Sequence, residues 1–336
     1  MNYLILYFFT LILTLNHKAI PNRFFFLTWF SVMAFFSLTL RLTGIDEAPS
    51  DSDIGSYVMN MKITEYVNGY HLREFIFWLG SRYLYQLIQD PALVFFVMDL
   101  VLFYFFYKSV STLHQLFPKY IQLENVKYLY FGAFLFFPYI AGFNNTYRFI
   151  LSVPFALYAI GLAKNAPVKS IGYFFISIFI HNSCILLFPI LVLVRGRYHS
   201  KLLASLISCL LVIAMYMMDT FSSSFFARSD GLEIGQKIAL IYLCTILLIT
   251  FFIVFFEYIA QSKINSLFLS IMIYMLIMYF SAYLFMTSLN AQRVFFLFLA
   301  LLYPMLGFYI ETRFKSGFYT RVAYSHIALL PLLYFQ

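Results

Sequence analysis

Charged residues are scarce in this sequence, at 11% of 336 residues, whereas soluble domains carry about 25%. This scarcity excludes an ordinary soluble fold. The 63% share of hydrophobic residues excludes an intrinsically disordered chain. Apolar residues recur in runs along the whole length, so the chain is not a soluble enzyme with one anchor. The sequence therefore predicts an all-α, polytopic integral membrane protein.

Cysteine is rare as well, and its spacing fits no metal site. Cys184, Cys209 and Cys244 each lie in an apolar run, so neither a disulfide framework nor a zinc site is expected. A basic stripe is also absent. The net charge of +8 comes from short clusters between apolar runs, a pattern that indicates membrane topology and not nucleic-acid binding. We expect no metal, no cofactor and no nucleic-acid partner.

Twelve apolar segments are predicted as transmembrane helices, several too short to cross about 30 Å of hydrocarbon unaided. The first lacks the basic region and cleavage site of a signal peptide, so it is counted as a membrane helix. Residues 1–336 are treated as one multi-pass domain. The segments are 3–15, 24–40, 91–107, 128–141, 149–163, 170–181, 183–194, 202–218, 238–256, 265–286, 294–310 and 322–335.

The distribution of Lys and Arg predicts which loops face the cytoplasm. One set of loops holds most of the basic residues and few acids, so the positive-inside rule makes it cytoplasmic and places both termini outside. This assignment needs two short passes within 170–194, broken at His181-Asn182-Ser183. A single crossing there is the alternative, and it would reverse every later loop. A break at membrane depth is tolerated only where it is buried in protein or lines a wet cavity, so it indicates a site.

The longest polar segment, residues 41–90, is rich in acids and is predicted to be extracytoplasmic. Its second half, at about 73–88, mixes apolar and polar residues in the pattern of a helix lying at the membrane interface. Asp90-Pro91 then forms a suitable N-cap and first turn for the next helix.

Three arginines are predicted to lie at the outer membrane boundary, where positive charge is scarce. Arg41 ends the second helix, Arg148 follows an outer turn that contains Asn145, and Arg293 opens a late helix. Each alone fits a side chain that reaches the headgroups or pairs with a loop carboxylate. Together they favour an anion site, since guanidinium groups bind phosphate in a bidentate manner.

Other polar residues are candidates for acid–base chemistry. His181 lies at the predicted break, and Asp53 and Tyr57 share a face if their segment is helical. Each has an ordinary alternative: His181 as a hydrogen-bonded interhelical residue, and Glu74 as a carboxylate that complements a helix dipole. Asp99, in the middle of an apolar run, must pair with a partner that the sequence does not identify.

The order of these motifs resembles the EpsG-type and Wzy-type polysaccharide (O-antigen) polymerases of bacterial surface glycan loci. In place of the family's Glu-Pro-Gly, this chain has Glu74-Phe75-Ile76, and Asp46, Asp51 and Asp53 are alternative equivalents of an acid in the outer loop. The matching stretches are Arg41–Asp46, Asp53–Tyr57, Arg73–Phe75, Asn145–Arg148 and Lys169–Ser183, with Arg293 in support.

The resemblance implies a glycosyltransferase of the bacterial inner membrane. It would join oligosaccharide repeat units linked to undecaprenyl pyrophosphate, at the outer face, into lipopolysaccharide O-antigen, capsule or exopolysaccharide. Arg148 and Arg293, supported by Arg41, would bind the pyrophosphate without a metal, and Asp53, Glu74 or His181 would be the general base. Tyr57 and Asn145 are further candidates. Expected partners are the bilayer, the lipid-linked glycans, a chain-length regulator and other assembly proteins.

Two other functions compete with this interpretation. A flippase or transporter of lipid-linked oligosaccharides would also have about twelve helices, although the sequence lacks the internal repeats typical of that class. A non-catalytic membrane subunit of a glycan assembly complex is the third alternative. It predicts that the candidate arginines and His181 can be replaced without loss.

Overall fold

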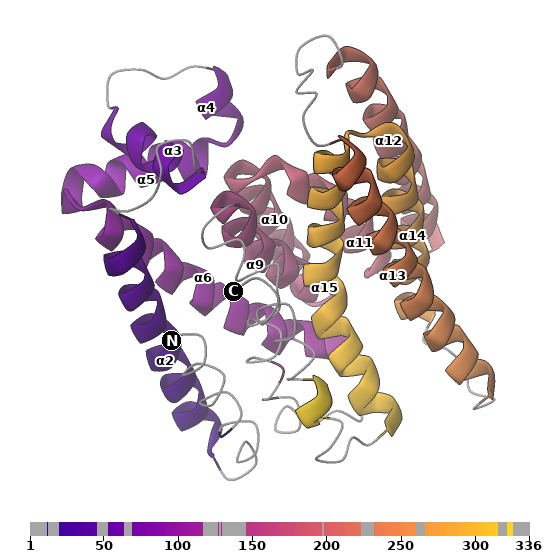
Figure 1. The fold of residues 1–336 in the computed structure, drawn as a ribbon. Coiled ribbons are helices and arrows are strands. Elements are labelled where there is room, and N and C mark those ends of the chain that lie inside the picture. Colours follow the sequence, from indigo (N-terminus) through magenta and orange to yellow (C-terminus); the bar gives the residue numbers. More distant parts are fainter. Residues whose placement is uncertain are drawn as a thin grey trace. The chain divides into compact units, whose positions relative to one another are not determined.

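A computed structural model of the chain confirms the helical fold class. Throughout the part of the chain that it describes, regular secondary structure is helical (Figure 1). The described residues are 20–45, 53–63, 69–116, 146–196, 198–222, 232–259, 266–314 and 321–324, with Ile12, Lys127 and Leu129.

Five described stretches are long and apolar enough to cross a membrane: Arg23–Gly44, Pro91–Leu116, His199–Met217, Leu267–Phe285 and Asn290–Glu311. Further apolar helices are shorter, as expected for several of the predicted segments. The predicted segments at 3–15, 128–141 and 322–335 lie almost entirely outside the described residues, so the count of twelve stays a prediction.

The contacts divide the chain into two compact units, Met1–Cys184 with Ala300–Gln336, and Ile185–Leu299. The first unit carries the candidate residues except Arg293. Its helices are α2 (Asn22–Gly44), α3 (Asp53–Lys62), α4 (Gly69–Arg73), α5 (Phe75–Ile88), α6 (Pro91–Leu113), η1 (His114–Leu116), α9 (Tyr147–Leu162) and α10 (Pro167–Ile180).

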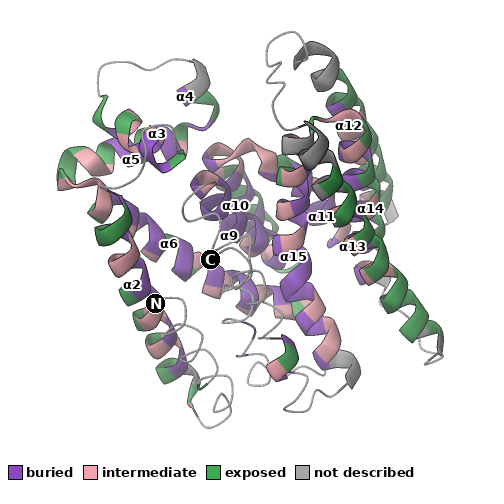
Figure 2. Cartoon of the chain, in the orientation of Figure 1, coloured by how far each residue is buried: buried purple, intermediate pink, exposed green. Residues whose placement is uncertain are grey.

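The core of the first unit is built on α6, which packs against α2 and α9, while α9 packs against α10. Nearly every residue of α9 is buried, as Figure 2 shows. Small residues permit this close packing: Ser170 on α10 donates from Oγ to the backbone oxygen of Ala159 at 2.7 Å, and Gly161 lies against Thr112. The Asp90 carboxylate caps α6 by accepting from two backbone amides, as predicted.

Residues 41–90 contain more helix than the sequence predicted. The helix α5 occupies most of the expected stretch 73–88, and α3 and α4 precede it. The position of α5 at the membrane interface stays a prediction. One face of α5 is buried, with Phe77, Trp78 and Arg82 turned inward, while Leu79 and Tyr83 are exposed. Arg82 Nε donates to the backbone oxygen of Asn60 at 3.0 Å, which ties α5 to α3. Much of the expected loop is thus a helical layer.

The predicted break is present in the structure. α10 ends at Ile180, His181 has extended backbone with φ −153° and ψ 116°, and the chain then enters the 3₁₀ helix η3 (Asn182–Leu187) and α11 (Phe188–Leu193). Asparagine and serine, which follow His181, are poorer helix formers than the apolar residues leucine and methionine, so the helix ends here at little cost. The side of the membrane on which the break lies stays a prediction.

The second unit contains the apolar helices α12 (Tyr198–Ser222), α13 (Leu232–Ile259) and α14 (Ser266–Phe285). α14 packs against both α12 and α13. The helix α15 (Ser288–Phe314) begins in this unit and ends in the first.

Candidate active site

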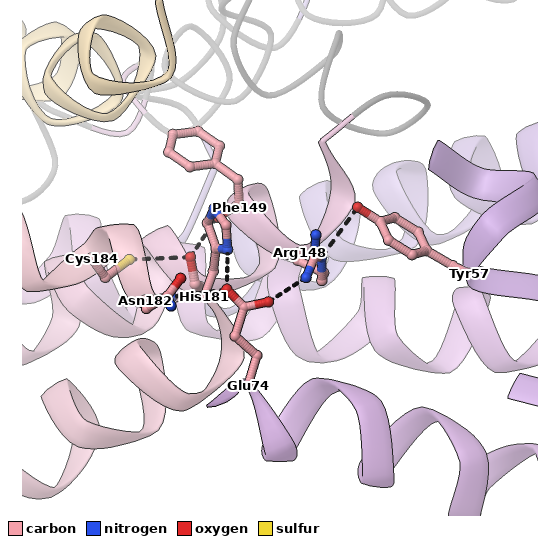
Figure 3. A network of polar contacts seen from close by, with 8 residues as sticks. Tyr57, Glu74, Arg148, Phe149, His181, Asn182 and Cys184 are labelled. Atoms are coloured by element: carbon pink, nitrogen blue, oxygen red, sulfur yellow. Dashed lines mark hydrogen bonds and ion pairs between the residues drawn. The ribbon is translucent and has the colours of Figure 1, made fainter. Parts of the chain in front are cut away.

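A single buried carboxylate, that of Glu74, joins two of the predicted site residues. Its side chain is 1% exposed. Oε1 accepts from His181 Nδ1 at 2.7 Å and from the backbone N–H of Asn182 at 3.2 Å (Figure 3). Oε2 accepts from Nη1 of Arg148. Three parts of the chain that are far apart in sequence therefore meet at one side chain.

The position of Glu74 follows from where α5 begins. Glu74 is the N-cap residue, with φ −130°, and its carbonyl accepts from the Trp78 N–H at 3.2 Å to start the helix. Its carboxylate makes no capping bond to α5. Because it is not used for capping, the carboxylate is directed to His181 and Arg148, so the helix-dipole role does not account for its contacts.

Arg148 lies in the first turn of α9 and is held between aromatic rings. Nε donates to the hydroxyl of Tyr57 at 3.3 Å. The guanidinium carbon lies 5.4 Å from the ring centroid of Tyr57 and 5.0 Å from that of Trp78. Cation–π contacts of this kind fix the plane of a guanidinium group and stabilise its charge where the group is partly removed from water.

Asn182 extends the network toward Arg73. With its amide nitrogen facing Glu74, Nδ2 lies 2.6 Å from Oε1, and the amide oxygen accepts from Arg73 Nε at 2.8 Å. The rings of Phe149 and His181 are nearly perpendicular, with 6.2 Å between their centroids. The break at residue 181 therefore supplies a ring nitrogen, a backbone amide and a side-chain amide to the same carboxylate.

The electrostatics keep Glu74 ionised. Burial raises the pKa of its carboxyl, but the hydrogen bond and charge of His181, the charge of Arg148 and the Asn182 amide outweigh burial, so the pKa lies below its usual value. An ionised carboxylate only accepts hydrogen bonds, so His181 Nδ1 carries the hydrogen. In the neutral imidazole, Nε2 is then the nitrogen that can take up a proton.

The model of the EpsG family matches residues 29–335, nearly the whole chain. The chain belongs to the EpsG family. With its apolar helices, this membership makes it a membrane protein of the polysaccharide-polymerase type, as the order of its motifs indicated. No curated protein and no solved structure matches it.

In this EpsG-family protein, Arg41 belongs to a second network. Its Nε donates to Asp99 Oδ2 at 2.8 Å and Nη2 donates to Oδ1 at 3.1 Å, and both side chains are almost completely buried. Ser37 and Tyr147 also donate to Asp99, at 2.6 and 2.7 Å. This pairing identifies the partner of Asp99. Two nitrogens of the Arg41 guanidinium are thus bonded to one buried carboxylate, and the expected support of the pyrophosphate by Arg41 stays a prediction.

The remaining candidates of this EpsG-family protein lie apart from the network or outside the described residues. Asp53 is exposed and is the first residue of α3. The segment is helical, so Asp53 and Tyr57 lie four residues apart on one helix. Of these two residues, only Tyr57 takes part in the contacts described above. Arg293 is exposed on α15 in the second unit. Asn145 lies outside the described residues.

Two contributions to the network, those of Trp78 and Asn182, were not predicted from the sequence. Trp78 lies on the segment expected at the membrane interface, yet it is 3% exposed and stacks with Arg148. Asn182 was noted only as part of the break; its position directly after a membrane histidine was the available signal. Among the described residues, no group of three or more His, Cys, Asp and Glu side chains is placed to hold a metal ion. The metal independence of the reaction stays an expectation.

Proposed function

We propose that this EpsG-family protein is a glycosyltransferase that lengthens a glycan on undecaprenyl pyrophosphate by joining lipid-linked repeat units. The observation that carries the proposal is the sharing of Glu74 between His181 and Arg148. It places a proton acceptor and a cation on one buried carboxylate, the two groups that this reaction needs.

His181 is the general base in this proposal. Its Nδ1–H is held by Glu74, so Nε2 takes the proton of the acceptor hydroxyl, and the imidazolium that forms is stabilised by the carboxylate. Glu74 is the orienting group, since both of its oxygens are already hydrogen-bonded and its pKa is lowered. Asp53 stays a second candidate base because it is exposed at the start of α3.

Arg148 stabilises the leaving group. The bond between the donor sugar and a pyrophosphate oxygen breaks, and a bond from that sugar to the acceptor oxygen forms. The acceptor proton passes to His181, and the negative charge leaves on the lipid pyrophosphate. A guanidinium group placed where this charge develops lowers the barrier. Arg293 is a second candidate cation for the pyrophosphate.

The location proposed for the reaction is the outer face of the bacterial inner membrane. Support comes from the distribution of basic residues, which places residues 41–90, and with them Glu74, on the extracytoplasmic side. The bilayer would hold both lipid-linked substrates, and a chain-length regulator and other assembly proteins would act as partners. The product would be O-antigen, capsule or exopolysaccharide.

A reconstitution experiment tests the proposal. Purified protein in vesicles is given defined undecaprenyl-pyrophosphate-linked repeat units, and product length is read on a gel. A ladder of lengthened glycans is expected. Translocation of repeat units without lengthening would instead establish a flippase. If the protein neither lengthens nor translocates the repeat units, the role of a non-catalytic subunit remains.

A further inference from the structure

Tyr147 connects the active-site network to the buried ion pair of Arg41 and Asp99. Its ring is fully buried, and its hydroxyl donates to Asp99 Oδ1 at 2.7 Å. The guanidinium carbon of Arg41 lies 4.8 Å from the centroid of the Tyr147 ring, and Phe95 meets that ring edge-on at 5.0 Å. The phenol is therefore fixed by a hydrogen bond at its tip and by contacts on its ring.

The next residue along the chain is Arg148. Both lie in the first turn of α9, where Thr146 is the N-cap residue and its side chain makes no capping bond. Without such a cap, the start of a helix is prone to fraying unless other contacts hold it. The hydrogen bond from Tyr147 to Asp99 is a contact that anchors this turn to α6.

We propose that Tyr147 is a positioning residue that fixes Arg148 for the reaction, with Asp99 and Arg41 holding Tyr147 in place. The inference rests on the proposed function, since it assumes that Arg148 meets the pyrophosphate. A buried, fully hydrogen-bonded carboxylate gives a rigid anchor, because any movement would leave charge desolvated and unpaired. Misplacement of a reacting group by about 1 Å can cost on the order of 100-fold in rate.

Ser37 offers a matched control. Its hydroxyl donates to the other oxygen of Asp99 at 2.6 Å, and it is as fully buried as Tyr147, but it lies on α2, far in sequence from Arg148. Tyr147→Phe and Ser37→Ala therefore each remove one buried hydroxyl hydrogen bond to the same carboxylate. A purely structural role of the network predicts the same effect for both variants.

The experiment reads the position of Arg148 separately from activity. The chain has two tryptophans, Trp29 and Trp78, so Trp29→Phe leaves Trp78 as the single tryptophan, which can be excited at wavelengths that the 28 tyrosines do not absorb. Trp78 stacks with the Arg148 guanidinium, so its emission reports whether that contact is kept. In this background, emission, thermal unfolding and the elongation kinetics are measured for Tyr147→Phe and Ser37→Ala, in the full-length reconstituted protein.

We expect Tyr147→Phe to change the Trp78 emission and to lower kcat for elongation by about tenfold, with little change in KM, because the misplaced group acts in the transition state. Ser37→Ala should change emission and kcat much less, since Ser37 lies on α2 and bonds the Asp99 oxygen that Tyr147 does not use. Equal effects of the two variants, or an unchanged emission and kcat in Tyr147→Phe, would overturn the inference. If the parent protein does not elongate glycans but Tyr147→Phe alone changes the emission, the positioning of Arg148 stands and the proposed function fails.

Discussion

At the scale of single residues, the separate roles of His181 and Arg148 follow from the way both bond to Glu74. One oxygen accepts from His181 and Asn182 and the other accepts from Arg148. A carboxylate with both oxygens occupied by donors is a weak proton acceptor and a strong orienting group. This arrangement assigns proton transfer to the imidazole and charge stabilisation to the guanidinium.

Replacement of His181 by Gln should abolish most of the elongation activity. The amide fills a similar space but cannot take up the acceptor proton, and positioned general bases contribute roughly 10²- to 10⁴-fold in rate. Elongation kinetics of the reconstituted variant measure this loss. His199→Gln, an exposed histidine at the start of α12, is the control and should retain normal activity. A normal rate in His181→Gln would remove the imidazole from the mechanism.

The lowered pKa of Glu74 predicts how stability depends on pH. Because the folded-state pKa lies below the ordinary value of 4.5, the carboxylate stabilises the fold fully above that pH. The contribution is lost as the pH falls through the lower folded value. Thermal unfolding of the wild type and Glu74→Gln in detergent, from about pH 7 to about pH 3, should show a difference that shrinks toward acid. A constant difference would contradict the pairing described for Glu74.

The candidate site is built mainly from residues that lie at the ends of helices. Glu74 precedes α5, Arg148 is in the first turn of α9, and His181 follows α10. Helix ends leave backbone groups and side chains unused by the helix itself, and these become available to a site. The sequence predicted the break at His181 because the distribution of Lys and Arg between the loops needed two short passes within 170–194. It could not predict that α5 packs against α10, because that depends on tertiary packing of aromatic faces that carry no mark in the sequence.

Two substitutions of Asn182 distinguish the contribution of its backbone N–H from that of its side-chain amide. Both Asn182→Ala and Asn182→Pro remove the side-chain amide, but only proline also removes the N–H that donates to Glu74. Proline fits here, because Asn182 opens η3 and the preceding His181 is extended. Asn182→Pro should elongate roughly tenfold more slowly than Asn182→Ala, since hydrogen bonds to charged groups are among the stronger ones. Equal rates for the two variants would show that the backbone amide does not contribute.

The fold class and the family of the whole molecule could be predicted from the sequence, but the pairing of its buried charges could not. Composition alone indicated an all-α membrane protein, and the order of the motifs indicated the EpsG family, both of which are confirmed. The partner of Asp99 was not predictable, since Arg41 lies 58 residues away and its charge was interpreted as facing the outer surface. A buried ion pair satisfies both groups, and hydropathy cannot distinguish such an arginine from one that faces an anion.

The predicted sidedness can be tested by cysteine labelling. Met59 on α3 and Val168 at the start of α10 are 55% and 84% exposed. With the native cysteines replaced, an impermeant maleimide should label Met59→Cys in intact cells, and Val168→Cys only after permeabilisation, because the basic residues flanking α10 indicate the cytoplasm. Labelling of Met59→Cys only after permeabilisation would place Glu74 on the cytoplasmic side and contradict the proposed location.

The most direct test of the role of the Glu74 network is the elongation rate of Arg148→Lys on defined lipid-linked repeat units. Lysine keeps the positive charge but not the planar group that bonds Tyr57 and Glu74 together and stacks with Trp78. We predict a fall of about 10²-fold, comparable with the loss of one transition-state donor. Arg23→Lys, an exposed arginine near the start of α2, should elongate normally. A full-length ladder formed by Arg148→Lys at the wild-type rate would contradict the account.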